Sequence, residues 1–404
     1  MNEALYYSNG PVEWKYKQLG EVVKFEGGSQ PPKKYFSNEK LSGMVRLIQI
    51  RDYKTNDFIT YVPKELCRRF CNKDDIMIGR YGPPIFQILR GIEGAYNVAL
   101  IKAIPQEDVI DKEYLYYFIK NEHLFKLIDG LSQRTSGQTG IDMEILKKYI
   151  IPIPTKEEQK KIASILSTVD EQIDNVEALI EKNKELKKGL MQTLLTKGIG
   201  HTKFKKTEIG EIPEEWQNES LGDMVNFEGG TQPPKKYFSN ECLDGMIRLI
   251  QIRDYKSDKF KVYVPKELCR RFCDKSDVMI GRYGPPIFQI LRGLEGAYNV
   301  ALIKATPINE RLDREYLYYF LNNEKLFNLI DSLSQRTSGQ TGIDMEVLKA
   351  YKIPIPPKKE QEKIVLTLSQ IDKRIENYEN RNKKLEELKK GLMQQLLTGK
   401  IRTI

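Results

Sequence analysis

The sequence predicts an α+β fold: two similar mixed α/β globular domains separated by a long antiparallel two-helix coiled coil, with pseudo-two-fold symmetry. Two patterns support this prediction, an internal repeat that runs through nearly the whole chain and a stripe of apolar residues at coiled-coil spacing near the end of each repeat. The length of 404 residues, with 40% hydrophobic and 30% charged residues, is typical of a folded protein with two or three domains.

The repeat has an offset of 202 residues and needs no gap. GRYGPPIFQILRG occurs at residues 79–91 and again, letter for letter, at 281–293. Three further runs recur with at most one change: FEGGSQPPKKYFSNE (25–39 and 227–241), LIQIRDYK (47–54 and 249–256) and SQRTSGQTGID (132–142 and 334–344). Units of about 200 residues are too long for a solenoid, so they indicate a duplicated domain pair.

Each repeat begins with a mixed domain. Strand-type runs cover residues 45–50, 76–79, 85–89 and 96–103 of the first copy. One helix is predicted over residues 111–131, with Asp111 as its N-cap and Gly130 near its end. Glycine- and proline-rich loops connect the strands.

A long helix follows each mixed domain. The IPIP run at 151–154 predicts an extended segment, because each proline disfavours helix in the residue before it. Thr155 and Glu158 have the spacing of a capping box, and Pro357 replaces the threonine in the second copy. The apolar seam comprises Ile162, Leu166, Val169, Ile173, Val176 and Ile180, then Ile364, Leu368, Ile371, Ile375, Tyr378, Asn382 and Leu385. Asn382 either fixes the helix register or lies solvated at a frayed seam.

These patterns predict four segments. A first globular domain covers 1–154 and a first spacer helix 155–199; a second domain covers 200–356 and a second helix 357–404. Each helix stripe needs a partner, and the nearest is the copy in the other repeat.

Composition narrows the class of function. The formal net charge of +9 and pI near 9.0 favour polyanions, nucleic acid first. The chain has no apolar run of membrane-spanning length and its N-terminus lacks a secretory pattern, so a cytoplasmic protein is expected. The two CRRFC runs allow either paired thiolates on one helical turn, as in some metal sites, or reduced thiols packed beside a helix end; we favour the second.

Polar loops between the strands supply candidate DNA contacts. Arginine pairs with guanine and glutamine with adenine in the major groove, while lysine suits phosphate. The candidates in the first copy are Gln30, Lys33, Lys34, Arg51, Arg80, Tyr81, Arg134 and Gln138. Those in the second copy are Gln232, Lys235, Lys236, Arg253, Arg282, Tyr283, Arg336 and Gln340. Glycines and prolines in the same loops serve turn geometry.

A catalytic site is not indicated. The two histidines, His123 and His201, have no partner pattern, and the sequence contains no ATP-binding P-loop and no GxGxxG after a strand. GPPI at 82–85 and QPPK at 30–33 each lack one part of an amino-methyltransferase motif. We therefore expect a non-catalytic binding protein, with no metal site and no cofactor of its own.

The sequence resembles the specificity subunits of type I restriction–modification systems over nearly the whole chain. The resemblance rests on FEGGSQPP and FEGGTQPP, on EIGEIPEEW at 208–216, and on TGIDMEILKKYIIPIPTKEEQKKIASIL at 139–166 with its counterpart at 341–366. In that family a proline-rich strand followed by Glu-Gln begins each long helix; here these pairs are Glu158–Gln159 and Glu360–Gln361.

The resemblance implies two target recognition domains and a helix pair that docks two methyltransferase subunits, with ATP-driven restriction subunits in the assembly. S-adenosylmethionine and ATP are expected on those partners. Members usually pair two dissimilar recognition domains, whereas these two are nearly the same, which predicts a gapped inverted-repeat target. Three alternatives remain: a stand-alone repressor-like DNA-binding protein that reads an inverted repeat, a self-contained DNA-modifying enzyme, and a coiled-coil scaffold that binds no nucleic acid.

Overall fold

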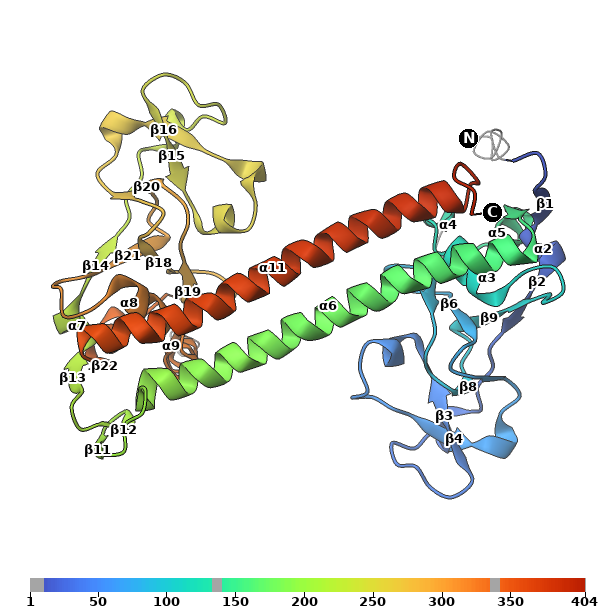
Figure 1. Ribbon diagram of the computed structural model, residues 1–404, viewed down its shortest axis with the longest axis horizontal. Helices are drawn as coiled ribbons and strands as arrows, with labels where there is room; N and C mark the ends of the chain where they lie inside the picture. Colours follow the sequence, from blue (N-terminus) through green and yellow to red (C-terminus); the bar gives the residue numbers. More distant parts are fainter. Residues whose placement is uncertain (1–10, 133–139, 335–341, 404) are drawn as a thin grey trace. The chain divides into compact units, whose positions relative to one another are not determined.

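The computed structural model describes residues 11–132, 140–334 and 342–403 (Figure 1). The chain divides into two compact units, the first formed by Met1–Glu177 with Asn380–Ile404 and the second by Ala178–Glu379. Each unit combines a mixed globular domain with one half of each long helix, which confirms the predicted fold class.

The first unit is built from three small sheets. Its strands are β1 Lys15–Gln18, β2 Val23–Gly27, β3 Met44–Ile48, β4 Tyr61–Pro63, β5 Phe70–Cys71, β6 Ile76–Gly79, β7 Gln87–Leu89, β8 Gly94–Tyr96, β9 Leu100–Pro105 and β10 Ile150–Ile153. One four-stranded sheet has the order β2-β9-β6-β7 and is antiparallel throughout. The second has the order β4-β3-β8-β5, in which β3 and β8 are parallel with Leu47 opposite Ala95. Strands β1 and β10 form an antiparallel pair.

Short helices connect these strands. They are α2 Leu19–Val22, α3 Lys112–Ile119, α4 Glu122–Ser132 and α5 Met143–Lys148, with 3₁₀ turns η1 Lys33–Tyr35, η2 Ile50–Tyr53 and η3 Lys64–Leu66. The predicted strand at 76–79 is confirmed as β6 and the IPIP segment as β10, whereas the strand predicted at 45–50 is confirmed as β3 only up to Ile48, because Ile50 begins η2.

The second unit repeats this order. Its strands are β13 Gln217–Ser220, β14 Val225–Gly229, β15 Met246–Ile250, β16 Tyr263–Pro265, β17 Phe272–Cys273, β18 Val278–Gly281, β19 Gln289–Leu291, β20 Gly296–Tyr298, β21 Leu302–Pro307 and β22 Lys352–Ile355. Its helices are α7 Leu221–Met224, α8 Arg314–Leu321, α9 Glu324–Ser334 and α10 Met345–Ala350, with η4 Lys235–Tyr237, η5 Ile252–Tyr255, η6 Asp258–Phe260 and η7 Lys266–Leu268. The sheets have the corresponding strand orders, and a hairpin of β11 Phe204–Thr207 and β12 Gly210–Pro213 is added.

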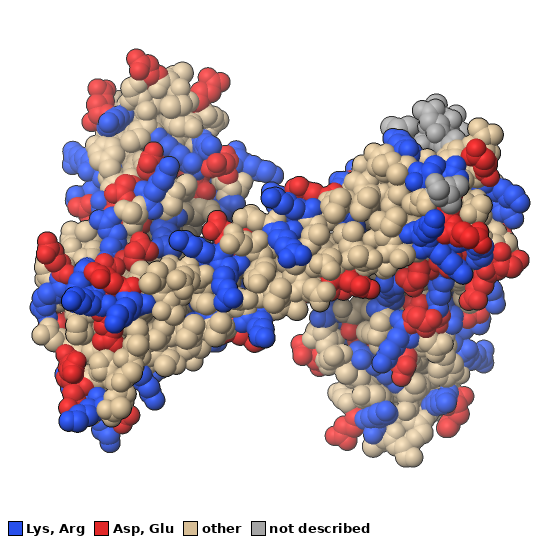
Figure 2. Space-filling view, in the orientation of Figure 1, with Lys and Arg blue, Asp and Glu red and all other residues tan. Residues whose placement is uncertain are grey.

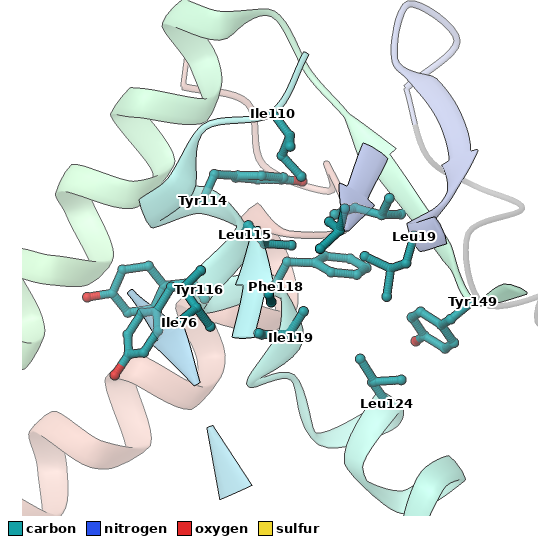
Figure 3. Packing of buried hydrophobic residues seen from close by; sticks show 14 of the residues in the cluster. Leu19, Ile76, Ile110, Tyr114, Leu115, Tyr116, Phe118, Ile119, Leu124 and Tyr149 are labelled. Carbon is teal, nitrogen blue, oxygen red and sulfur yellow. The ribbon is translucent and has the colours of Figure 1, made fainter. Parts of the chain in front are cut away.

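Helix α3 lies at the centre of the first unit's main core. The Asp111 carboxylate caps it by accepting hydrogen bonds from the backbone N–H groups of Glu113 and Tyr114, at 3.0 and 3.1 Å. Six of its eight residues are buried, and Figure 3 shows Phe118 pointing toward Leu19 in this core. Burial of so much apolar surface on one short helix fixes the domain against the long helices.

The long helices are α6 Lys156–Lys197 and α11 Lys358–Leu396. Within the first unit they run antiparallel, because Asp170 pairs with Lys389 while Gln172 pairs with Arg381. In the second unit Lys187 pairs with Asp372. None of the described helices is long and apolar enough to cross a membrane.

The predicted seam is mostly buried, as a coiled coil requires. Ile162, Leu166, Ile364 and Leu368 are fully buried. The Asn382 side-chain oxygen is also buried and receives no hydrogen bond from a described residue, whereas the residue as a whole is half-buried. Its role in setting the register stays a prediction.

The single helix predicted over 111–131 is wrong. Two helices, α3 and α4, are separated at Lys120 and Asn121, and the Asn121 side-chain oxygen accepts from the Leu124 N–H at 2.8 Å. Asparagine is a strong N-cap, so it starts a new helix where the apolar pattern alone suggested a continuous one. Gly130 lies two residues before the end of α4 at Ser132, as predicted.

Two strand predictions also need correction. The run at 96–103 is interrupted, because residues 97–99 form a turn between β8 and β9 and the Asn97 side-chain oxygen accepts from the Ala99 N–H at 3.1 Å. The run at 85–89 is a strand only from Gln87, because Phe86 has a positive φ of 56°.

The CRRFC segments contain no helical turn that could align two thiolates. Cys67 follows η3, whereas Cys71 lies in β5 and is buried in a different cluster. Burial raises the pKa of the Cys71 thiol to about 11. The cysteines are free thiols, as expected for packed reduced residues.

Each long helix has a Glu-Gln pair near its start; Glu158, Gln159 and Gln361 are fully buried, and Glu360 is half-buried. The Thr155 hydroxyl accepts from the Glu158 N–H at 3.3 Å, which is one half of the predicted capping box. The Glu158 carboxylate does not return to the cap. It accepts instead from the Trp14 indole at 3.0 Å and from two nitrogens of Arg402 at 2.6 and 2.9 Å.

The equivalent carboxylate in the second unit is that of Glu360. It accepts from the Trp216 indole at 3.0 Å and from the Ile199 N–H at 2.9 Å, and it lies 2.8 Å from the His201 ring nitrogen. His201 therefore has a structural partner, which the sequence did not indicate.

Candidate nucleic-acid interface

The turn at residues 97–99 holds the loop that carries Gln30. The Ser29 N–H donates to the Tyr96 carbonyl at 3.1 Å. A Cβ on Gly28 would lie 2.0 Å from the Asn97 carbonyl oxygen, so only glycine permits this approach. The second glycine of FEGG therefore presses the loop onto the turn and leaves Gln30 exposed.

The same turn holds the Arg80 loop. The Arg80 N–H donates to the Ala99 carbonyl at 2.8 Å. The next residue, Tyr81, forms a β-bridge with Gly140, the last residue of the RTSGQTG run. Its backbone pairing brings the end of that run beside Arg80, whose guanidinium lies over the Tyr81 ring at 5.3 Å. Two loops that are about 60 residues apart in sequence therefore share one place on the surface.

The strand that leads to the Arg51 loop is bonded to the same turn. The Asn97 N–H donates at 3.1 Å to the carbonyl of Ile48, the last residue of β3, and η2 begins two residues later. Arg51 is 51% exposed, its guanidinium lies 5.4 Å from the Phe58 ring, and its Nη2 donates to the Phe58 carbonyl at 3.3 Å. These contacts pre-orient the guanidinium while leaving other N–H donors available.

A buried carboxylate supports this loop. Asp52 is 4% exposed and accepts from the Gln49 N–H at 3.1 Å. Burial raises the pKa of Asp52 above its ordinary value, although the Gln49 hydrogen bond and the nearby charges of Arg46 and Arg51 oppose that rise. Asp52 thus fixes the turn rather than facing a ligand.

The second unit reproduces the arrangement. The N–H groups of Thr231, Arg282 and Asn299 donate to the carbonyls of Tyr298, Ala301 and Ile250 at 3.1, 2.8 and 3.1 Å. The Tyr283 ring lies beside Gly342, as Tyr81 lies beside Gly140. The duplicated letters therefore encode a duplicated surface.

Most predicted contact residues point into solvent. Gln30, Lys33, Lys34, Arg51, Tyr81, Gln232, Lys235, Lys236, Arg253 and Tyr283 are exposed, and Arg80 and Arg282 are half-buried. Arg134, Gln138, Arg336 and Gln340 lie outside the described residues. Lys33 and Lys34 lie on η1, between the Gln30 loop and strand β4.

Sequence reasoning missed Val98 and Phe58. Val98 is 48% exposed in the turn at residues 97–99, and Phe58 is 59% exposed beside Arg51. Their counterparts Val300 and Phe260 are 46% and 61% exposed. An asparagine directly after a strand could have marked the turn, whereas Phe58 carries no such signal.

Charges of both signs are interspersed over the face shown in Figure 2. Many lysines and arginines are held by carboxylates, such as Arg69 with Glu26 at 2.7 Å and Lys112 with Asp74 at 2.7 Å. Within residues 11–132, 140–334 and 342–403, no cluster of three His, Cys, Asp or Glu side chains could hold a metal ion. The surface can therefore offer hydrogen bonds and local positive charge to a polyanion.

A groove lies where each globular domain meets the long helices. In the first unit it has a volume of about 500 Å³ and runs between α4 and the second half of α11, with Lys126, His123, Met393 and Leu397 among its lining residues. In the second unit a groove of about 750 Å³ lies between α9 and α6. Both grooves are lined by apolar side chains together with lysine and glutamate, a composition that suits a docking surface.

Two features define the class of protein: a loop surface that occurs in both units, and a long helix that follows each mixed domain in the chain. Residues 11–187 and 213–387 both match the type I restriction modification DNA specificity domain. The chain belongs to this family.

Relatives match along the whole chain. It is 33% identical to the putative type I restriction enzyme MjaX specificity subunit and 29% identical to the MjaVIII specificity subunit, both from Methanocaldococcus jannaschii. Each match covers 97% of this chain and 94% of the relative. The EcoKI specificity subunit of Escherichia coli is 26% identical over 80% of this chain and 73% of its own.

Solved structures show the same fold. The type I restriction-modification S subunit from M. genitalium has a TM-score of 0.62 at 16% identity, covering 96% of this chain and 97% of its own. A chain from a study of assembly and conformational transition in the type I R-M system has a TM-score of 0.56 at 19% identity, covering 97% and 100%.

Proposed function

We propose that this chain is the DNA-specificity subunit of a type I restriction–modification complex and reads a gapped, bipartite site with similar or identical half-sites in inverted orientation. One observation carries the proposal: the two units have loops of nearly identical sequence, and in each unit these loops are hydrogen-bonded in the same way to the equivalent turn of that unit. Two equal readers favour two equal half-sites.

The proposed contacts have distinct roles. Arg80 and Arg282 suit guanine, Gln30 and Gln232 suit adenine, and the η1 and η4 lysines suit phosphate. Arg51 and Arg253 add a second guanidinium to each surface. The four candidates outside the described residues, Arg134, Gln138, Arg336 and Gln340, belong to the same proposal because their runs end beside Tyr81 and Tyr283.

Partner subunits complete the activity. The two grooves support docking of one methyltransferase subunit on each unit, together with restriction subunits in the same assembly. S-adenosylmethionine and ATP would be held by those partners, and this chain would supply recognition without catalysis.

Selection from random duplex DNA with the assembled complex tests the proposal. Enrichment of a gapped inverted repeat is the expected result. An enriched site with two dissimilar halves would contradict the proposed symmetry, and no enrichment by an intact complex would contradict DNA reading.

Substitutions at Arg80 identify the base that it reads. R80A should weaken binding to a matched site by about 1–3 kcal/mol, the range for one bidentate pair. R80K keeps the charge and loses the fork, so it should relax the choice of base while leaving the salt dependence of binding unchanged. Equal affinities of wild type, R80A and R80K would remove Arg80 from the interface.

A further inference from the structure

The two domains differ in charge at one loop next to the candidate interface. Residues 55–60 read TNDFIT and residues 257–262 read SDKFKV. The neutral and acidic residues of the first loop become Asp258, Lys259 and Lys261 in the second. The formal charge of these loops is −1 in the first domain and +1 in the second, a difference of two unit charges.

The frame of the loop is the same in both domains. Each loop leads into the second strand of an antiparallel pair, with Arg46 opposite Tyr61 in the first domain. The tip residues Phe58 and Phe260 remain 59% and 61% exposed. Arg51 and Arg253 lie over these rings at 5.4 and 5.6 Å. An aromatic tip that is retained while its flanks diverge indicates a loop that meets a partner rather than plain solvent.

Ion pairs inside the loops decide which charges face outward. In the first loop the Asn56 side-chain oxygen accepts from Arg46 at 3.1 Å, and Asp57 is exposed. In the second loop Asp258 pairs with both Lys261 at 3.1 Å and Arg248 at 2.9 Å.

These two partners neutralise the Asp258 carboxylate. The hydrogen bond from Lys261, followed by that from Arg248, holds the pKa of Asp258 below its ordinary value. Lys259 is then the exposed charge of the second loop that forms no ion pair with a described residue, at the position where the first loop carries an exposed carboxylate.

We propose that the loop at 257–262 grips the DNA phosphate backbone through Lys259, with Lys261 as a weaker contributor, whereas the loop at 55–60 does not. The inference rests on the proposed DNA-reading function. Two domains with nearly the same base-reading loops would then hold the backbone of their half-sites unequally, because Asp57 repels the phosphates that Lys259 attracts.

The difference has a measurable size. Each phosphate neutralised by a protein cation contributes about 0.9 to the slope of log K against log salt for duplex DNA. One extra phosphate contact therefore loses about threefold to fourfold in affinity when salt rises fourfold, as from about 50 to 200 mM.

Exchanging the loops tests the proposal within the full chain. D258N/K259D/K261I gives the second domain the charges of the first loop, and N56D/D57K/I59K does the reverse. Each replacement follows a sequence that already adopts this loop in the other domain. The control C242K/D244S adds two unit charges in the loop before β15, at the opposite end of the β15–β16 pair from residues 257–262.

Binding to the selected duplex is measured across a potassium chloride series for the four chains. We expect the slope to flatten by about 0.9 in D258N/K259D/K261I, to steepen by about 0.9 in N56D/D57K/I59K, and to stay unchanged in the control. Four coinciding slopes, or a control that shifts as much as N56D/D57K/I59K, would overturn the inference. A wild-type chain that selects no site would instead overturn the proposed function.

Discussion

Gln159 holds three backbone groups together where the first long helix begins. It is fully buried, and its side-chain oxygen accepts from the Asp111 N–H at 2.6 Å. Its side-chain nitrogen donates to the carbonyls of Val109 and Pro154 at 3.1 and 2.9 Å. One amide thus joins the start of α6, the end of β10 and the N-cap of α3.

Gln159→Leu should destabilise the first unit by about 3 kcal/mol or more. The leucine has a similar volume but leaves three buried backbone groups without partners, each costing about 1–3 kcal/mol. With a urea m-value of about 2–3 kcal/mol/M for a domain of this size, the midpoint should fall by about 1 M or more.

The two tryptophans allow each unit to be followed separately. Trp14 donates to Glu158 in the first unit and Trp216 donates to Glu360 in the second. In a W216F background, fluorescence of Trp14 reports the first unit alone during urea unfolding. The exposed control Gln106→Leu, which also lies in the first unit, should change stability by less than about 0.5 kcal/mol. If the urea midpoint of Gln159→Leu equalled that of the W216F background, the estimate based on unpaired backbone groups would be refuted.

Three further predictions concern thiols, acid and the helices. When the native chain is treated with a thiol reagent at neutral pH, the exposed Cys242 should react in a fast phase that is absent in C242S. Cys71 should react slowly, because burial raises the pKa of its thiol to about 11. Equal reaction rates for the two cysteines would refute the burial of Cys71. Burial raises the pKa of Glu158, but hydrogen bonds from Arg402 and Trp14 outweigh this and hold it below its ordinary 4.5. The stabilisation that ionised Glu158 contributes is therefore complete above pH 4.5 and is lost as the pH falls through the lower pKa of the folded state. Urea midpoints should fall more steeply with acid in the wild type than in E158Q. Parallel curves for the two proteins would contradict this prediction. Deleting seven residues from both α6 and α11 removes about 10 Å of helix and should shorten the selected spacer by about 3 base pairs, whereas an unchanged spacer would show that the helices do not set it.

The sequence was sufficient for features that depend on local chemistry or on periodicity. Asp111 was predicted as a cap because its side chain acts on the next residues, and the seam of α6 was visible as apolar spacing. The break at Asn121 was missed because the apolar pattern continues through both α3 and α4, while the asparagine cap competes locally with one continuous helix.

The candidate interface could be predicted only in part. Loops rich in glycine, proline, arginine and glutamine were evident, but their convergence depends on backbone pairing across long sequence distances, such as Ser29 with Tyr96 and Arg80 with Ala99. The partner of Glu158 could not be foreseen either, since Arg402 is 244 residues away. Contacts of this kind leave no periodic trace in the sequence.

Main-chain atoms anchor the loops to the turn at residues 97–99, which leaves the side chains of these loops free to change in evolution. Ser29, Arg80 and Asn97 attach through their backbone N–H groups, so their side chains are not needed for the attachment. Neighbouring side chains in these loops can be exchanged without rebuilding the scaffold beneath them. If the two copies read DNA as proposed, a new preference can arise in one copy, persist there as an asymmetric intermediate, and later be copied into the other. The target of such a chain can then change between symmetric and asymmetric forms while its fold stays the same.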